Sequence, residues 1–240
     1  MTNPTAAMLV IGDEILSGRT LDTNTQHLAA RLTQMGIRMA EVRVVPDVHE
    51  VIVEAVNALR AAYTHVFTSG GIGPTHDDIT AECIAAAFGV GIGIRDDARA
   101  ILQAHYDRSG LEFNAARQRM ARIPDGAALI DNPISSAPGF TIGNVHVMAG
   151  VPDVFHAMVA GVLPTITGGA PLLSQTLRVM RGEGEVAAEL GGIAAEFPEL
   201  SIGSYPFQLN GAYGTNIVVR GTDGGMIDRA MIRVAALAGR

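Results

Sequence analysis

The sequence predicts an α/β protein in which a three-layer α/β/α domain with a mostly parallel sheet precedes a small α+β domain. Apolar runs of strand length alternate with amphipathic segments of helix length over residues 7–162. The strands are almost continuously apolar, which is typical of parallel sheets covered by helices on both faces. A stretch rich in Pro, Gly and Thr, LPTITGGAP (Leu163–Pro171), then separates this part from a differently patterned C-terminal region. We therefore expect two domains, at residues 1–168 and 172–240.

In the first half of the larger domain, each of three strands precedes a helix. The strands are expected at residues 7–12, 37–45 and 65–70, and the helices at residues 25–36, 47–62 and 78–89. Leu28, Leu32 and Met35 recur at helical spacing, and Gly36 and Gly89 are placed to end their helices. Because ligands bind at the carboxyl ends of parallel strands, we expect the loops after these strands to converge on one binding edge.

The remaining segments continue the alternation and then change it. Helices are expected at residues 96–110, 114–123 and 152–162, and a strand at residues 144–150. The C-terminal region is expected to contain strands at 175–180, 200–206 and 216–221 and helices at 185–196 and 225–237. Asn210-Gly211 is a hairpin signal between its last two strands. Few polar groups cluster in this region, so we interpret it as an accessory or dimerisation domain.

Composition narrows the class of protein. The chain has 240 residues, 48% hydrophobic and 17% charged, and a formal net charge of −7. No global basic field is present, so we expect neither nucleic acid nor a membrane as a partner. The N-terminal MTNPTAA has no basic residue and contains a proline, and Cys83 has no second cysteine with which to form a disulfide. These features favour a cytoplasmic protein without a signal peptide.

The segment FTSGGIGPTHDDIT (Phe67–Thr80) carries the strongest chemical signal. A glycine-rich turn between a strand and a helix can hold a phosphate or another anion with its amides and with the helix N-terminus. It is neither a Walker loop nor a G-x-G-x-x-G motif. Alternatively, the glycines only shape a turn and Asp78 caps the helix. Capping needs one acceptor, so the second carboxylate, Asp77, favours a metal ion that bridges the aspartates to a phosphate.

The loop after the first strand, IGDEILSGRTLDTN (Ile11–Asn24), is dense in short polar side chains. Their oxygens suit Mg²⁺ or substrate hydroxyls, whereas capping of the following helix by Asp22 or Thr23 is the structural alternative. The side chains in question are Asp13, Glu14, Ser17, Asp22, Thr23 and Asn24.

Several further features give only weak functional signals. Asp47 is placed as the N-cap of a helix, with Glu50 as its capping-box partner. The arginines Arg117, Arg119 and Arg122 can offset phosphate charge, but an exposed helical face explains them more simply. The histidines lack zinc-ligand spacing. The turn at Pro138-Gly139 is a weak signal by itself.

Taken together, these stretches resemble the molybdopterin-binding (MoaB/Mog-like) superfamily, and within it the N-terminal part of CinA-type competence/damage-inducible proteins. The resemblance rests on IGDEILSG, DTNTQHLA, TSGGIGPTHDDIT, RMARIPDGA, APGF and AGVP, which span residues 8 to about 165. Longer relatives carry a nicotinamide-nucleotide amidase domain, which we expect to be absent here, so deamidase activity is not carried over. The sequence also departs from the family: Ile134-Ser135-Ser136 stands where relatives often have a glycine-containing stretch, and Met148-Ala149 where Leu-Pro is frequent.

The resemblance implies a phosphorylated pterin or nucleotide as ligand. In molybdenum-cofactor members an aspartate after the glycine-rich loop is essential to adenylylation of molybdopterin, and Asp78 matches it, while Asp47 matches a second family aspartate. CinA-type relatives are described as pyrophosphatases that act on ADP-ribose and depend on a divalent metal and potassium. We therefore expect Asp78 and Asp47 to be catalytic, and Asp78, Asp77 and Glu14 to hold Mg²⁺, Mn²⁺ or Co²⁺. The expected substrate-binding residues are Ser69, Gly70, Gly71, Gly73, Thr75, Gly12, Ser17, Gly18, Asp22, Asn24, Pro138 and Gly139.

Three function classes stay open on the sequence. The first is metal-assisted hydrolysis of a pyrophosphate linkage, and the second is a carrier or sensor of molybdopterin or a nucleotide that performs no turnover. The third is a scaffold that acts through the C-terminal region, in which case the glycine-rich loop is only a turn. Members of the family commonly associate as dimers or trimers, so the resemblance also implies a homo-oligomer.

Overall fold

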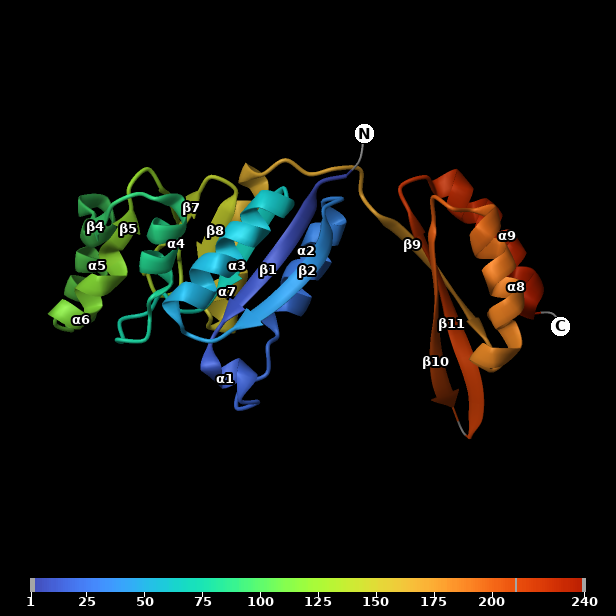
Figure 1. Ribbon diagram of the computed structural model, residues 1–240. Coiled ribbons are helices and arrows are strands. Elements are labelled where there is room, and N and C mark those ends of the chain that lie inside the picture. Colours follow the sequence, from blue (N-terminus) through green and yellow to red (C-terminus); the bar gives the residue numbers. More distant parts are fainter. Residues whose placement is uncertain (1–2, 210, 239–240) are drawn as a thin grey trace. The chain divides into compact units, whose positions relative to one another are not determined.

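Figure 1 shows the computed structural model, which describes residues 3–209 and 211–238. The chain divides into two compact units, Met1–Gly169 and Ala170–Arg240. Each unit has its own hydrophobic core, and each is described by itself below.

The first unit is built on a six-stranded sheet in the order β2-β1-β3-β8-β7-β6. The strands β2, β1, β3 and β8 run parallel, whereas β7 and β6 continue the sheet in antiparallel fashion. The strands are β1 (Thr5–Ile11), β2 (Arg38–Val45), β3 (His65–Ser69), β6 (Ala128–Ile130), β7 (Gly139–Ile142) and β8 (Val145–Met148). A short antiparallel pair, β4 (Ile92–Ile94) and β5 (Arg122–Pro124), stands apart from this sheet. The predicted mostly parallel sheet is thus confirmed.

Helices cover both faces of the sheet. Successive side chains of a strand point to opposite faces, so each strand contributes side chains to two cores. Ala7, Leu9 and Ile11 of β1 pack into one core with residues of α3 and α4, and the alternate residues of β1 pack into a second core with residues of α2 and α7. The helices of the unit are α1 (Asp13–Leu16), α2 (Asn24–Gln34), α3 (His49–Ala62), α4 (Thr80–Phe88), α5 (Asp96–Ser109), α6 (Ala115–Gln118) and α7 (Pro152–Val162), with 3-10 turns η1 (Arg119–Ala121) and η2 (Leu163–Thr165). The unit therefore has the three predicted layers.

The helix expected over residues 114–123 is wrong in its second half. The segment contains only the single turn α6 and the 3-10 turn η1, and it then extends as β5, which pairs with β4. The apolar spacing of this segment resembles that of a helix, but strand pairing with residues about thirty positions earlier overrides it. The short strands β4, β6 and β7 were also missed, since three or four residues carry no periodic signal.

The second unit is a three-stranded antiparallel sheet in the order β10-β11-β9, with its core formed against two helices. Its elements are β9 (Leu173–Val179), α8 (Glu183–Glu196), β10 (Ser201–Leu209), β11 (Ala212–Gly221) and α9 (Gly224–Ala238). The small α+β domain is confirmed, and β10 and β11 pair as the expected hairpin. Asn210 of the hairpin signal lies outside the described residues, while Gly211 has a φ of 82°. Over the described ranges, no helix is both long enough and apolar enough to cross a membrane.

Candidate functional site

The loops after β1, β2 and β3 meet at the carboxyl edge of the sheet. The N–H of Gly12 donates to the Val45 carbonyl at 3.1 Å, and the N–H of Asp13 donates to Oδ2 of Asp47 at 3.0 Å. These bonds bring together segments that are more than thirty residues apart. The convergence predicted from the alternating pattern is therefore confirmed.

The glycine-rich turn depends on the absence of side chains at two positions. A Cβ at Gly70 would lie 2.2 Å from the Ile11 carbonyl oxygen, and one at Gly71 would lie 2.1 Å from Oγ1 of Thr80. Both glycines have positive φ, 107° and 68°. The Thr80 hydroxyl, which is buried, donates to the Gly70 carbonyl at 3.0 Å and fastens the turn to α4. Larger residues would push the turn away from the sheet.

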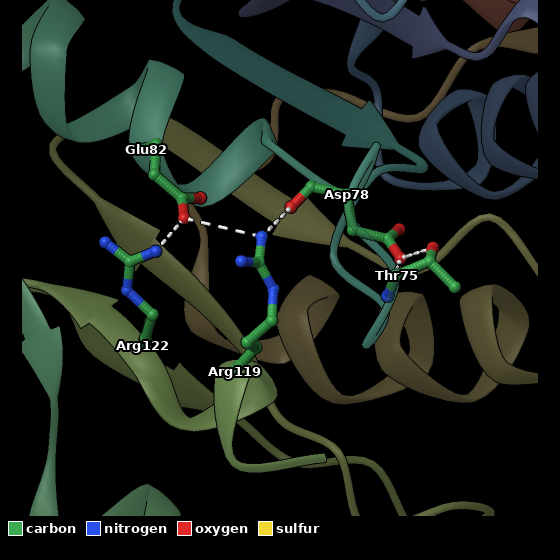
Figure 2. A network of polar contacts seen from close by, with 5 residues as sticks. All are labelled: Thr75, Asp78, Glu82, Arg119 and Arg122. Atoms are coloured by element: carbon green, nitrogen blue, oxygen red, sulfur yellow. Dashed lines mark hydrogen bonds and ion pairs between the residues drawn. The ribbon is translucent and has the colours of Figure 1, made fainter. Parts of the chain in front are cut away.

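Asp78 holds the far side of this turn rather than capping α4. Its Oδ2 accepts a hydrogen bond from the backbone N–H of Thr75 at 2.8 Å and another from the Thr75 hydroxyl (Figure 2). The N-cap residue of α4 is Ile79, and no side chain caps this helix. The capping alternative for Asp78 is therefore wrong, because the carboxylate turns back toward Thr75. A Cβ at Gly73 would lie 2.6 Å from the same oxygen, so Gly73 makes room for the carboxylate.

Asp47 does not cap α3 either. The N-cap of α3 is Val48, which makes no side-chain cap bond, and the Asp47 carboxylate instead reaches the N–H of Asp13. Burial raises the pKa of Asp47, and the neighbouring carboxylates of Asp13, Glu14 and Asp77 raise it further. The capping-box interpretation of Asp47 and Glu50 is therefore wrong, and Asp47 belongs to a group of acidic side chains at the sheet edge.

Asp77 lies in a different environment from Asp47. A hydrogen bond from Thr75 is the main cause that lowers the pKa of Asp77, and its side chain is largely exposed beside His76. Exposure leaves the Asp77 carboxylate able to meet a ligand from solvent.

The acidic side chains suit a cation that takes only part of its coordination from the protein. Within the described residues, no three His, Cys, Asp or Glu side chains lie together as a metal-binding group. The carboxylates of Asp13, Glu14 and Asp77 nevertheless lie near enough to Asp47 for their charges to raise its pKa. Mg²⁺ is commonly bound through one or two carboxylates together with substrate phosphates. The donor set fits this mode and not a closed cage of protein ligands.

Asn24 connects three of the converging segments. Its Nδ2 donates to Oγ of Ser69 at 2.9 Å and to the Gly150 carbonyl at 2.8 Å, and the side chain is almost completely buried. Oδ1 of Asp22 accepts hydrogen bonds from the N–H groups of Asn24 and Thr25, at 2.9 and 3.2 Å. The capping role considered for Asp22 is confirmed. The buried side chains of Asn24 and Ser69 therefore stabilise the arrangement of the loops at the carboxyl edge of the sheet.

The converging loops enclose a cleft of about 480 Å³. Five of the expected site residues line it, namely Glu14, Gly70, Gly71, Gly73 and Asp78. A smaller hollow of about 50 Å³ is lined in part by Glu14, Asp22, Asn24 and Ser69. Much of the wall of the main cleft is apolar and is formed by side chains that were not among the expected site residues, including Ile72, Met120, Ala137, Ala149, Val151 and Val154.

The other expected site residues do not line the main cleft. Ser17, Gly18, Thr75 and Asp77 are exposed, while Pro138 and Gly139 are buried. A Cβ at Gly139 would lie 2.3 Å from the Val147 carbonyl oxygen, so this glycine serves the close pairing of β7 with β8. Gly12 and Asp47 do not line the cleft, and their hydrogen bonds join the end of β1 to the end of β2.

Sequence reasoning gave too little weight to two arginines. Arg119 and Arg122 meet Glu82 of α4 beside the glycine-rich turn, and Arg119 also contacts the Asp78 carbonyl (Figure 2). Arg117 lies elsewhere, with its guanidinium 4.7 Å from the centre of the Tyr106 ring. Their spacing suggested one exposed helical face, but the helix ends after one turn, and Arg119 on η1 and Arg122 at the start of β5 turn to Glu82 while Arg117 on α6 does not.

Comparison with protein families is decisive for the first unit. Residues 7–168 match a family model described as a probable molybdopterin binding domain. The chain belongs to this molybdopterin-binding domain family. Residues 171–239 match a second model, the FAD synthase middle domain.

Individual relatives define the family membership more narrowly. The CinA-like protein of Citrifermentans bemidjiense is 38% identical over 206 residues, which are 83% of this chain and 48% of that relative. A protein of Aeropyrum pernix is 32% identical over 240 residues, covering 98% of this chain and 85% of its own. The crystal structure of CinA from Thermoplasma acidophilum, described as a protein of unknown function, is 34% identical with a TM-score of 0.63 and covers 68% of this chain and 99% of that one. The chain is therefore CinA-like, and it spans about half the length of the Citrifermentans relative.

Proposed function

We propose that this CinA-like chain is a divalent-metal-dependent pyrophosphatase that acts on ADP-ribose or similar nucleoside diphosphates. The observation that supports it most is the cleft of about 480 Å³ at the carboxyl edge of the sheet, where the glycine-rich turn lies beside Glu14 and Asp78. Ligand sites in open α/β sheets are found at this edge. A cleft bounded by backbone amides on one side and carboxylates on another suits a phosphate together with a cation.

The backbone N–H groups of the glycine-rich turn differ in whether they can bind a phosphate. The Gly70 N–H donates to the Met148 carbonyl at 3.2 Å and thus serves the sheet. Gly71 and Gly73 line the cleft, and their N–H groups donate to no protein group that the structure describes. These two amides are therefore the ones that would hold a phosphate oxygen.

The acidic residues would hold the cation. Asp78 and Glu14 line the cleft, Asp77 is exposed beside it, and Asp47 is the half-buried member of the group. A bound Mg²⁺, Mn²⁺ or Co²⁺ would lower the pKa of a water molecule and neutralise phosphate charge, and potassium would act as a further activating ion. The glycine-rich turn would orient the diphosphate, and the carboxylates of Asp47 and Asp78 would hold the cation that neutralises its charge.

A second function is favoured by the apolar wall of the same cleft. Apolar side chains such as Ile72, Met120 and Val154 can pack against a planar ring, and the matched family is described as molybdopterin-binding. The alternative is therefore a protein that binds molybdopterin or a nucleotide without turnover.

The two functions are separated by one set of measurements. Purified protein is incubated with ADP-ribose, FAD or NAD and each of Mg²⁺, Mn²⁺ and Co²⁺, and the mononucleotide products are quantified. Asp78→Asn should keep the fold, since an amide oxygen can still accept from Thr75, and should abolish turnover. Asp107→Asn on α5 is the matched control and should retain full activity, because its only described partner is Gln103 on the same helix.

Two outcomes would contradict the hydrolase. Asp78→Asn that turns over like the wild type would remove the assignment of this residue. Wild-type protein that binds a pterin tightly by calorimetry, yet cleaves none of the three pyrophosphate compounds with any of the metals, would support the binding protein instead.

A further inference from the structure

Arg119 is a cation beside the glycine-rich turn whose hydrogen-bonding capacity is mostly unused. Its Nη2 lies 3.4 Å from the carbonyl oxygen of Asp78 and 3.9 Å from Oε1 of Glu82. Its Nε is buried and has no hydrogen-bond partner among the described residues. A guanidinium carries five N–H donors, so most of them are not engaged by the protein.

Glu82 does not neutralise Arg119, because the same oxygen is held more closely by Arg122. Oε1 of Glu82 accepts a short hydrogen bond from Nη1 of Arg122, whereas Arg119 stays at 3.9 Å. Figure 2 shows Arg119 between Glu82 and Asp78, with the Asp78 carboxylate turned away toward Thr75. Two cations facing one carboxylate leave one positive charge uncompensated at this side of the turn.

Arg119 lines a small hollow that shares part of its lining with the main cleft. Arg119, Glu82 and Arg122 line a hollow of about 20 Å³. This hollow has room for a group the size of one water molecule, which is a single ligand oxygen and not a whole phosphate. Five residues line both this hollow and the main cleft: Gly71, Ile72, Gly73, Asp78 and Met120.

We propose that Arg119 is a substrate-binding residue that donates hydrogen bonds to a phosphoryl oxygen of a diphosphate-bearing ligand in the main cleft. Glu82 is held by Arg122 and offsets the charge of Arg119 only in part. Arginine forms strong, charge-assisted hydrogen bonds to phosphate. The acidic residues around Asp47 carry no positive charge, so they cannot bind a phosphate in this way. The inference rests on the proposed function for the choice of a diphosphate, but it does not require turnover.

The test measures binding of methylenediphosphonate, a diphosphate analogue whose bridging carbon prevents hydrolysis. The full chain is titrated by calorimetry with and without Mg²⁺. Arg119→Gln should weaken binding about tenfold or more, as expected for loss of a charge-assisted hydrogen bond. Arg117→Gln is the matched control and should bind like the wild type, because Arg117 contacts Glu112 and Tyr106.

Glu82→Gln gives a second readout of opposite sign. Removing this carboxylate leaves the charges of Arg119 and Arg122 uncompensated, so affinity for the diphosphonate should rise severalfold. A purely architectural cluster would instead lose thermal stability in both variants and show no gain in affinity in either. The opposite signs in Arg119→Gln and Glu82→Gln are therefore specific to anion binding.

The outcomes separate this inference from the proposed hydrolase. Folded Arg119→Gln that binds the diphosphonate like the wild type overturns the role of Arg119, even if ADP-ribose is hydrolysed. If Arg119→Gln does not fold, unchanged or weaker binding by Glu82→Gln overturns it. Wild-type protein that binds the diphosphonate through Arg119 but hydrolyses no dinucleotide contradicts the hydrolase and supports this inference.

Discussion

Gly71 and Thr80 are packed so closely that a Cβ atom at residue 71 would lie 2.1 Å from the Thr80 hydroxyl oxygen. The N–H of Thr80 donates to the Gly71 carbonyl at 2.9 Å, and the Thr80 hydroxyl donates to the Gly70 carbonyl at 3.0 Å. The glycine-rich turn and the first residue of α4 therefore form one packed unit. The shape of the candidate phosphate site depends on this contact.

Gly71→Ala should lower the free energy of unfolding by about 2–4 kcal/mol, because a residue with φ of 68° is strained and its Cβ also collides with Thr80. Gly18→Ala is the matched control, with a φ of 72° and nothing within 4 Å of the added Cβ, and should cost only about 1 kcal/mol. Urea unfolding measures both. Combining Gly71→Ala with Thr80→Ala should recover part of the loss. Equal costs for the two glycine variants would show that the close contact has no energetic effect.

Asp47→Asn should stabilise the protein without added metal while weakening its response to divalent cations. The folded-state pKa of Asp47 is raised, so the stability contributed by this carboxyl is present below its unfolded pKa and is lost as pH rises through the folded pKa. Replacing this half-buried charge should raise the free energy of unfolding at pH 8 by on the order of 0.5–1 kcal/mol. At pH 3 the wild-type carboxyl is protonated, and the difference should vanish.

Urea unfolding of wild type and Asp47→Asn at both pH values, with and without Mg²⁺, tests this expectation. Mg²⁺ should stabilise the wild type more than the variant. A variant that is destabilised at pH 8 would mean that the Asp47 charge is compensated by the protein.

His146 should make the protein sensitive to mild acid. Burial, together with the nearby charge of His65, lowers the pKa of His146 to about 4, so the imidazole is neutral in the folded state at neutral pH. A depressed histidine pKa means that its contribution to stability is present above pH ~6.5 and is lost as pH falls toward 4. The loss should be roughly 3 kcal/mol, at about 1.4 kcal/mol per pH unit.

Unfolding free energies measured between pH 7 and 4 check this. His146→Gln should show a shallower slope than the wild type, whereas His76→Gln, at a side chain that is 99% exposed, should keep the wild-type slope. A wild-type slope in His146→Gln would assign the acid sensitivity to other groups.

Ser136→Gly should stabilise the fold by up to about 1 kcal/mol. Ser136 has a φ of 62° and is the one non-glycine residue with positive φ among those described, in a stretch where CinA-type relatives often have glycine. Ser135→Gly is the contrasting variant and should destabilise, because the Ser135 hydroxyl accepts a 2.6 Å hydrogen bond from Nδ2 of Asn132. Thermal unfolding measures both. A lower melting temperature for Ser136→Gly would show that its side chain makes a compensating contact.

The sequence was sufficient to predict those elements whose pattern is contained in one local segment. The apolar runs of β1 and β3 and the periodic helices α2, α3 and α7 were predicted, because each pattern repeats over enough residues to be distinguished from chance. The glycine-rich turn was also predicted, since positive φ and close backbone approach leave glycine as the usual residue. The same reasoning failed for α6 and β5, where a pairing with β4 decided the structure.

The roles of single side chains were harder to predict than the elements that carry them. Asp47 and Asp78 both precede a helix and have the local pattern of N-caps, yet each turns to a different partner, Asp13 and Thr75. A sequence pattern typical of an N-cap does not exclude another hydrogen-bond partner for the same side chain, and only the structure shows which bond forms.

By itself, the sequence determined the alternation of strands and helices, the binding edge of the sheet and the residues of the glycine-rich turn. Only the tertiary structure decided which side chains meet at that edge. Asn24 bonds to a carbonyl 126 residues away, and Arg119 reaches the Asp78 carbonyl across 41 residues. Such contacts depend on the order of strands in the sheet and on the packing of helices against it, and these are properties of the whole chain and not of any local segment.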